Sequence, residues 1–369
     1  MTQRLYIDGS EILITPNLEH IIRVLLSHEN GPAAVRGKAI WIDAACIDQD
    51  NTKEKEQQIP LMGQIYRQAI RALMWLGDAE GHADWAMMCM SDPDFCFAAS
   101  TLNKIRRSPT ADEIRLELIM EEDLETRSYW TRVWIGQEMT LPRNDPLILC
   151  GRHCVAWSCY VNLLQWLPDH RGVYPEVADL WDDVKASIPR GISSRSSWMH
   201  RVFREAYMDL GAEKMNLAAV LNFTSFLGAS NPRDYIHGSM GIVRPEDARL
   251  VIPTYSKSVT EVFKEAFRIV WLFDPNPSIA LKGLSFHHVE GSPDGLPSWA
   301  PDLSNQILPG LLEDRAGDRL RGNPRVGRAT WQSPTWPTFD GDILLFEAVE
   351  FDEVEKIETV DFNHGWRPT

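Results

Sequence analysis

The sequence lacks an excess of positive charge. It has 37 Lys and Arg residues against 52 Asp and Glu residues, a formal net charge of −15 at pH 7. No compact run of Lys and Arg offsets this acidity, and such a chain repels a phosphate backbone or an anionic lipid surface. General DNA or RNA binding and attachment to an acidic membrane are therefore disfavoured.

Long apolar runs and cysteines are also scarce. No stretch approaches the ~18 consecutive apolar residues that a membrane-spanning helix requires. The segment from Met1 to Asp8 has no long apolar run of the kind found in secretory signals. Six cysteines in 369 residues are few for a chain of this size, which is consistent with a reducing environment. These absences predict a cytoplasmic protein without a membrane segment.

The chain also has no G-x-x-x-x-G-K-[ST] sequence, so it carries no P-loop for a nucleoside triphosphate. What it does have is an ordinary globular composition, with 44% hydrophobic and 24% charged residues. A length of 369 residues predicts about two domains. Trp is frequent, with 14 residues, and side chains of this size usually lie in cores or clefts.

The N-terminal segment predicts a hairpin, a helix and a buried strand. An Asp-Gly dipeptide between two short apolar runs favours a two-residue type I′ turn, which predicts a β-hairpin over 5–14. A Thr-Pro pair then predicts the start of an amphipathic helix over 16–28. The apolar run at 39–44 predicts a strand with Asp43 at its carboxyl end.

The next segments predict alternating helices and strands. Apolar residues at helical spacing predict a helix over 59–73, with Pro60 in its first turn or at a kink. Strands are predicted over 72–77 and 147–151, with a helix over 129–141 before the second. This order indicates parallel βαβ units.

Beyond this part the pattern changes to longer helices and then to a tail rich in Gly, Pro and Trp. The other predicted elements are an irregular insertion over 78–109, helices over 110–122, 158–167, 198–209, 215–228 and 258–273, and a strand pair within 343–360. We expect the Arg233-Asp234 and Trp299–Asp302 motifs to hold the C-terminal region onto the α/β unit.

Three stretches of sequence resemble a known family. They are WIDAACIDQD at 41–50 with its continuation to MWLG at 74–77, YWTRVWIGQE at 129–138, and RDYIHGSMGI at 233–242 with LPSWAPD downstream at 296–302. In this order, and over most of residues 5–302, the chain resembles the fungal HET (heterokaryon incompatibility) domain family.

The resemblance implies a fold. HET domains are similar to TIR domains, which are flavodoxin-like α/β modules, so we expect a mainly parallel sheet with flanking helices. Three regions are expected: a HET domain over 1–155, a mostly helical HET-associated region over 156–282, and an irregular tail with some β structure over 283–369. The family usually opens with a strand of the type Tyr-x-Ala-Leu-Ser-Tyr-x-Trp-Gly. This chain begins at the hairpin that follows it, so we expect the sheet to lack that strand.

The resemblance also implies a function. HET proteins take part in self/non-self recognition, in which incompatible fusion triggers cell death, and some TIR domains cleave NAD at the nicotinamide–ribose bond. The TIR pattern has a Trp followed four residues later by a Glu, and Trp134 and Glu138 match that spacing. By this resemblance Glu138 is the candidate catalytic acid and Trp134 a candidate NAD-binding residue.

The chemistry of these residue types is consistent with that assignment. Residues i and i+4 share one helix face, so Trp134 and Glu138 are expected to stack one above the other. Ligands of open α/β sheets bind beyond the carboxyl ends of the strands, which makes Asp43 a second candidate for NAD binding. Cleavage of the N-glycosidic bond develops positive charge on the ribose, and one carboxylate can stabilise it. The enzymatic hypothesis is therefore an NAD glycohydrolase that takes NAD as substrate and needs no bound cofactor.

Other interpretations of the same residues stay open. Glu138 can pair with Arg132 or Arg143, Trp134 can pack in a core, and Asp43 can cap a neighbouring loop. The chain is then a non-catalytic interaction module, which acts by self-association or by docking onto a sensor protein. A degenerate, inactive HET protein is the remaining alternative.

A metal site and a cysteine nucleophile are disfavoured. No His is placed by the sequence to activate Cys46, and its acidic neighbours raise the pKa of a thiol. The spacing of Cys150, Cys154 and Cys159 is not that of paired zinc ligands. We expect these three to be buried thiols.

Overall fold

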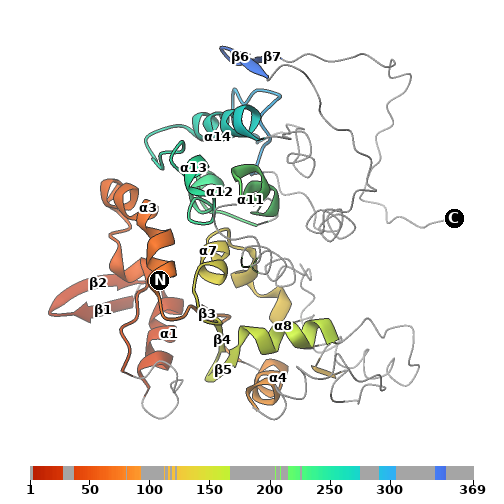
Figure 1. Ribbon diagram of the computed structural model, residues 1–369. Coiled ribbons are helices and arrows are strands. Elements are labelled where there is room, and N and C mark those ends of the chain that lie inside the picture. Colours follow the sequence, from red (N-terminus) through yellow and green to blue (C-terminus); the bar gives the residue numbers. More distant parts are fainter. Residues whose placement is uncertain are drawn as a thin grey trace.

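The computed structural model describes the chain in several stretches. The described residues are 3–27, 37–79, 81–92, 123–166, 215–224, 227–274, 291–304 and 337–345, with single positions at 112, 115, 116, 119, 120, 204 and 208. These stretches form a mixed α/β structure of helices and small sheets (Figure 1). None of their helices is long and apolar enough to cross a membrane.

The chain opens with the predicted hairpin. Strands β1 (Gln3–Ile7) and β2 (Ser10–Ile14) pair in antiparallel fashion and form a two-stranded sheet of their own. Asp8 and Gly9 adopt positive φ angles of 48° and 82°, as a type I′ turn requires. The hairpin prediction is therefore confirmed.

Helix α1 (Pro16–Leu26) confirms the predicted first helix. Its N-cap is Thr15, whose side-chain oxygen accepts a hydrogen bond from the Leu18 amide at 3.2 Å. Leu25 is buried, in a small apolar cluster with Leu147 and Leu149. The amphipathic pattern thus attaches this helix to the central sheet.

The predicted strand over 39–44 is not formed. Residues 39–42 lie outside any strand, and helix α2 (Asp43–Cys46) follows them directly. The carbonyl of Ile42 accepts hydrogen bonds from the Ala45 and Cys46 amides, so it already belongs to the helix. A strand needs a ladder partner, and no described segment pairs with 39–42. Asp43 therefore begins a short helix instead of ending a strand.

Helix α3 (Thr52–Gln68) begins earlier than the apolar pattern indicates. The side chain of Asn51 caps it by accepting a hydrogen bond from the Glu54 amide at 3.2 Å. Its first two turns are polar and contain no buried residue, so the apolar spacing becomes visible only from Ile59. Pro60 therefore lies inside the helix, which excludes the first turn and leaves a kink as the other predicted effect.

The central sheet has three strands in the order β3–β4–β5. Strand β3 (Leu73–Trp75) pairs in parallel with β4 (Leu147–Cys150), and β4 pairs in antiparallel fashion with β5 (His153–Ala156). The two predicted strands and their parallel pairing are confirmed, whereas β5 was not predicted. The described chain is thus α/β, and the larger flavodoxin-like sheet stays a prediction from the resemblance.

Helices surround this sheet. They are α4 (His82–Ser91), within the segment predicted to be irregular, the short 3₁₀ helices η2 (Leu124–Thr126) and η3 (Ser128–Thr131), then α7 (Ile135–Thr140) and α8 (Trp157–Trp166). Most of the predicted helices over 110–122 and 198–209 lies outside the described residues, and the positions described within them are helical.

The predicted helix over 129–141 is broken into η3 and α7 by a long-range contact. Between them, the Val133 amide donates to the carbonyl of Gly228 at 2.9 Å, and the Gly228 amide donates to the carbonyl of Thr131. Arg132 and Gly228 form an isolated parallel bridge. Because these backbone groups bond outside the helix, the helical ladder is interrupted at this point.

The C-terminal region confirms the helical pattern. It contains α11 (Leu217–Thr224), α12 (Asp234–His237), α13 (Pro245–Ala248) and α14 (Val259–Phe273), followed by a hairpin of β6 (Thr338–Asp340) and β7 (Ile343–Leu345). Ser258 and Glu261 form a capping box at the start of α14. The hairpin begins before the predicted segment 343–360.

Two hydrophobic cores meet at α7. One surrounds the central sheet and includes Ile135 and Met139 of α7, while the other surrounds α14 and includes the flanking Val133 and Leu141. Figure 1 shows α7 between the sheet and the group of α11 to α14. Side chains of α7 are therefore placed where the two parts of the chain join.

Candidate functional site

The carboxylate of Glu138 is half-buried on α7. Its Oε2 accepts a hydrogen bond from the hydroxyl of Tyr129, which lies on η3, at 2.8 Å. Removal from water raises the pKa of Glu138 and raises that of Tyr129 well above its usual value. Tyr129 thus stays protonated and holds the carboxylate in place.

Three further polar side chains act on Glu138. The positive charge of Arg132 and the hydroxyl of Tyr66 on α3 lower its pKa, while the charge of Asp43 raises it. Burial is the largest of these influences, so the pKa of Glu138 remains raised. We call Asp43, Tyr66, Tyr129, Arg132 and Glu138 the Glu138 cluster.

Asp43 bonds to its neighbours in the chain and also acts on Glu138. Its carboxylate accepts a hydrogen bond from the following Ala44 amide at 2.8 Å, and its carbonyl accepts one from the side chain of Gln49 at 3.1 Å. It also lies close enough to Glu138 to act on its pKa. The structure therefore brings Asp43 and Glu138 together at one site.

The indole of Trp134 bonds to the C-terminal region, and its stacking over Glu138 stays a prediction from their spacing. Trp134 is the N-cap residue of α7, ahead of the first regular turn. Its indole Nε1 donates to the carboxylate of Asp234 on α12 at 3.3 Å, while Glu138 bonds to Tyr129. Trp134 already has helical backbone angles (φ −64°, ψ −27°), so the break between η3 and α7 lies before it and leaves its four-residue spacing to Glu138 unchanged. The two side chains nevertheless have different hydrogen-bond partners.

The 129–138 and 233–242 segments pack against each other around Asp234. Its carboxylate accepts hydrogen bonds from Trp134 and from the hydroxyl of Tyr255, the latter at 2.6 Å. The side-chain amide of Gln137 donates to the carbonyl of Gly238 at 2.8 Å. The prediction that the motif of Arg233 and Asp234 holds the C-terminal region onto the α/β unit is confirmed.

The motif of Trp299 and Asp302 has a different role from the predicted one. The indole of Trp299 donates to the carbonyl of Asp342 at 2.7 Å, and its own carbonyl accepts from Trp271 of α14 at 3.0 Å. Asp302 accepts from nearby loop residues, with Ser292 at 2.7 Å. Within the part of the chain that the structure describes, the hydrogen bonds of this motif therefore join α14 to the C-terminal hairpin and not to the α/β unit.

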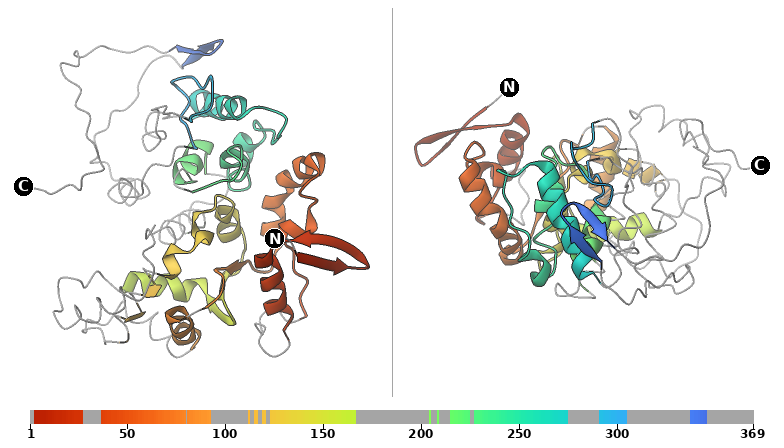
Figure 2. Two further views of the ribbon diagram at one scale, coloured as in Figure 1. Left: turned by 180° about the vertical axis from the view of Figure 1, so that it is seen from behind. Right: turned by 90° about the horizontal axis from the view of Figure 1, so that it is seen from above.

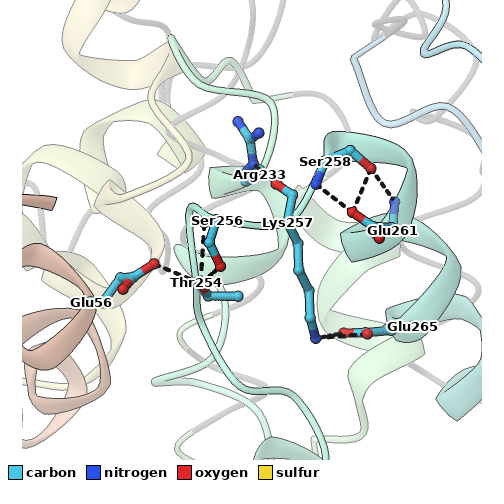
Figure 3. A network of polar contacts seen from close by, with 8 residues as sticks. All are labelled: Glu56, Arg233, Thr254, Ser256, Lys257, Ser258, Glu261 and Glu265. Carbon is cyan, nitrogen blue, oxygen red and sulfur yellow. Dashed lines mark hydrogen bonds and ion pairs between the residues drawn. The ribbon is translucent and has the colours of Figure 1, made fainter. Parts of the chain in front are cut away.

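A second polar contact ties α3 to the loop before α14 (Figure 3). One oxygen of Glu56 accepts from the hydroxyl of Thr254 at 2.6 Å and from the Tyr255 amide at 2.7 Å. These bonds lower the pKa of Glu56. The Nε of Arg233 donates to the carbonyl of Lys257 in the same loop at 2.6 Å.

His237, the last residue of α12, packs against Tyr255 at this contact. Its side chain is buried without a hydrogen-bond partner at either ring nitrogen, and its ring meets Tyr255 edge-on at 5.3 Å between centroids. Burial lowers the pKa of His237 to about 4, so the imidazole is neutral near pH 7. It therefore packs as an aromatic ring and carries no charge at this junction.

Comparison with known proteins identifies the N-terminal part. A family model for the heterokaryon incompatibility protein (HET) matches residues 1–138. The chain carries a HET domain. That domain includes all five residues of the Glu138 cluster and ends at Glu138 itself.

A curated relative extends the likeness beyond the HET domain. Heterokaryon incompatibility protein 6, OR allele, from Neurospora crassa is 23% identical over 312 residues, which covers 73% of this chain and 45% of that protein. The chain thus spans less than half the length of the relative. No solved structure matches this chain.

Sequence reasoning did not single out Tyr66 or Tyr129 of the Glu138 cluster, and it named Arg132 only as one of two arginines able to pair with Glu138. Tyr66, Tyr129 and Arg132 all lie in the HET motif segments, but their roles depend on how α3, η3 and α7 converge. A signal was present in the sequence: Tyr129 and Arg132 occur in the same ten-residue motif as Glu138.

The described part of the chain contains no group of three or more His, Cys, Asp or Glu side chains that could hold a metal ion. Cys150 and Cys154 are free thiols, and burial raises their pKa to about 12 and about 11. Cys159 is disulfide-bonded, so the expectation of a buried thiol is wrong there. The neighbouring His153 has its Nε2 2.8 Å from the carboxylate of Asp84.

Proposed function

We propose that the chain acts in heterokaryon incompatibility-type self/non-self recognition and cell-death signalling. The HET domain over residues 1–138 and the similarity to a Neurospora crassa protein named for heterokaryon incompatibility support this role. The chain spans less than half the length of that protein, so the role of the whole relative is only proposed for this chain.

We further propose that the HET domain cleaves NAD at the Glu138 cluster. The bond between the ribose C1′ and the nicotinamide nitrogen breaks, and its electron pair leaves with nicotinamide. Water forms the new C1′–O bond and releases a proton to solvent. Positive charge develops on the ribose in between, and the ionised Glu138 carboxylate stabilises it.

The observation that carries this proposal is the hydrogen bond from Tyr129 to Glu138 at 2.8 Å. It fixes a carboxylate in a half-buried position, where charge–charge interactions are stronger than in bulk water. Asp43 places a second carboxylate nearby. Because burial raises the pKa of Glu138 and the reaction needs its ionised form, nicotinamide release increases with pH through that raised pKa.

The test compares two glutamates that each bond to a tyrosine. Glu138→Gln keeps an oxygen for Tyr129 but removes the charge. The matched control is Glu125→Gln, because Glu125 is 3% exposed and accepts from Tyr160 at 2.5 Å in the sheet core. We expect Glu138→Gln to lower nicotinamide release from NAD about 100-fold or more, while Glu125→Gln retains the rate.

Equal rates in the two variants would remove Glu138 from the mechanism. Folding is checked by circular dichroism and urea unfolding for each variant, so that a lost rate is not a lost fold. Nicotinamide is measured directly with the full chain at high concentration.

A non-catalytic interaction module is the second candidate, and one observation favours it. The indole of Trp134 is bonded to Asp234, so the ring that the TIR pattern assigns to NAD has its one donor bonded within the chain. A folded chain that neither binds NAD in calorimetry nor releases nicotinamide would support this candidate over the enzyme.

A further inference from the structure

The hairpin of β1 and β2 projects from the rest of the HET domain (Figure 2). None of the five residues of β1 is buried. Tyr6, Ile7 and Leu13 are 62%, 46% and 63% exposed, which is unusual for large apolar side chains in a strand pair. An isolated two-stranded hairpin is marginally stable in water, and a further strand stabilises it.

The register identifies the backbone groups that face outward. Ile7 and Ser10 flank the two-residue turn and oppose each other, so they exchange hydrogen bonds. Such pairs alternate along an antiparallel ladder, so Leu5 also bonds inward, to β2. The N–H and C=O groups of Arg4 and Tyr6 therefore point outward from β1.

This outer edge has few of the features that protect natural strand edges. Over Gln3–Ile7 there is no Pro or Gly, and the register shows no bulge. Arg4 carries the one charge of the strand, and its guanidinium is 3.4 Å from Glu11 on β2. Short length is the remaining protection.

We propose that β1 pairs with β1 of a second copy of this chain, in antiparallel fashion about a two-fold axis at Leu5. Arg4 of each copy then lies opposite Tyr6 of the other copy, which gives two equivalent pairs. These are the residues whose backbone groups point outward, so each of the two pairs exchanges both hydrogen bonds. The four strands form one continuous sheet, and the proposal is independent of the proposed NAD cleavage.

The side chains are self-complementary in this arrangement, which argues for a second copy as the occupant. On one face, Leu5 and Ile12 meet their counterparts and form a row of four apolar side chains. On the other face, each Arg4 lies beside a Tyr6 ring of the other copy, and that Tyr6 donates to its own Glu11 at 2.7 Å. No like charges face each other across the new pair.

Pairing through the β2 edge is less favourable. Ile14 at the end of β2 is 3% exposed, so that end of the strand is already packed against the domain. A two-fold pair about Ile12 would also place the charged Glu11 opposite the apolar Leu13. The β1 edge has neither disadvantage.

The first test is hydrogen exchange on the unmodified full chain, with fragmentation that resolves single amides. Exchange is followed at increasing protein concentration in about 0.15 M salt, where the net charge of −15 is screened beyond about 8 Å. We expect the Arg4 and Tyr6 amides to gain protection about tenfold or more as concentration rises. Protection of the Glu11 and Leu13 amides instead, or of neither pair, would overturn the proposal.

The second test uses a matched pair of proline variants and the molar mass in solution. Tyr6→Pro removes an outward N–H on β1, and Leu13→Pro removes one on β2 at a residue of almost equal exposure. We expect the unmodified chain to approach twice 42.0 kDa, Tyr6→Pro to weaken dimerisation about tenfold or more, and Leu13→Pro to leave it unchanged. A monomer at every concentration, or an equal loss in both variants, would contradict pairing through β1.

Discussion

The indole of Trp134 and the carboxylate of Asp234 form a hydrogen bond of 3.3 Å between residues 100 positions apart. Trp134 packs against the core around α14, while the next residue, Ile135, is buried in the core around the central sheet. The bond therefore joins the HET domain to the helical region at the point where their two cores meet.

Replacing Trp134 tests this junction. Trp134→Phe keeps an aromatic ring but removes the donor, and a hydrogen bond to a charged group is worth about 1.5 to 3 kcal/mol. We expect the free energy of unfolding to fall by about 1.5 kcal/mol, measured by urea denaturation. Asp234 keeps its bond from Tyr255, which limits the loss.

A double-mutant cycle separates the hydrogen bond from the change in ring size. If the bond matters, Trp134→Phe costs less in an Asp234→Ala background, which removes the acceptor, by at least about 0.5 kcal/mol. Additive effects of the two changes would show that Trp134 contributes by packing alone.

The contact of α3 with the turn after α12 depends on two glycines. A Cβ on Gly241 would lie 2.1 Å from Oε1 of Gln137 and 2.9 Å from the Cα of Gly63. Gln137 cannot easily move, because its amide nitrogen is bonded to Gly238. We expect Gly241→Ala to lower the free energy of unfolding by about 2 kcal/mol.

Gly136→Ala is the control for this prediction. Its Cβ would lie 3.2 Å from the terminal methyl of Ile242, which can shift by a few tenths of an ångström. Alanine also favours the helical conformation of α7 relative to glycine. We expect the free energy of unfolding of Gly136→Ala, measured in urea, to be unchanged or slightly higher than that of the unmodified chain. An equal decrease in both variants would refute the steric argument.

The contrast between local and long-range determinants explains what the sequence could predict. The type I′ turn at Asp8 and Gly9 and the cap at Thr15 follow from neighbouring residues, and both were predicted correctly. The break between η3 and α7 depends on Gly228, almost a hundred residues away. No helical pattern within 129–141 contains that information.

The Glu138 cluster was predictable only in part for the same reason. Glu138 was identified from its motif and Asp43 from a predicted strand end that does not form, yet the structure places Asp43 close enough to act on the pKa of Glu138. Tyr66 joins them because α3 packs beside α7, which requires the tertiary fold. Trp134 was assigned to the same face by its spacing, and its bond to Asp234, 100 positions away, could not be predicted from that spacing.

The raised pKa of Glu138 makes stability depend on pH with a definite sign. A carboxyl whose pKa is higher in the folded state binds more protons there than in the unfolded chain. Stability from this group therefore decreases as pH rises from the unfolded pKa through the raised folded pKa. Glu138→Gln, which stays neutral, should be more stable than the unmodified chain above this interval.

Urea unfolding at several pH values checks this sign. The difference between the two proteins should shrink as pH falls below the ordinary glutamate range, because the carboxyl is then neutral in both states. If Glu138→Gln is less stable than the unmodified chain at pH 7, the field of Arg132 outweighs burial and the pKa is lowered instead.

Glu56 gives the opposite pH dependence at the second junction. The Thr254 hydroxyl and the Tyr255 amide lower its pKa, so the stability that it contributes is present above the unfolded pKa and is lost as pH falls through the folded pKa. Glu56→Ala removes the acceptor, and we expect the Tyr255 amide to exchange with deuterium faster at pH 7. In the unmodified chain the same amide should lose protection on acidification, and the variant should not show this loss.

Glu246→Ala is the control, because it removes an exposed carboxylate on α13 and should leave the exchange of the Tyr255 amide unchanged. An equal effect of both variants would mean that net charge, not the hydrogen bond to Glu56, protects the loop.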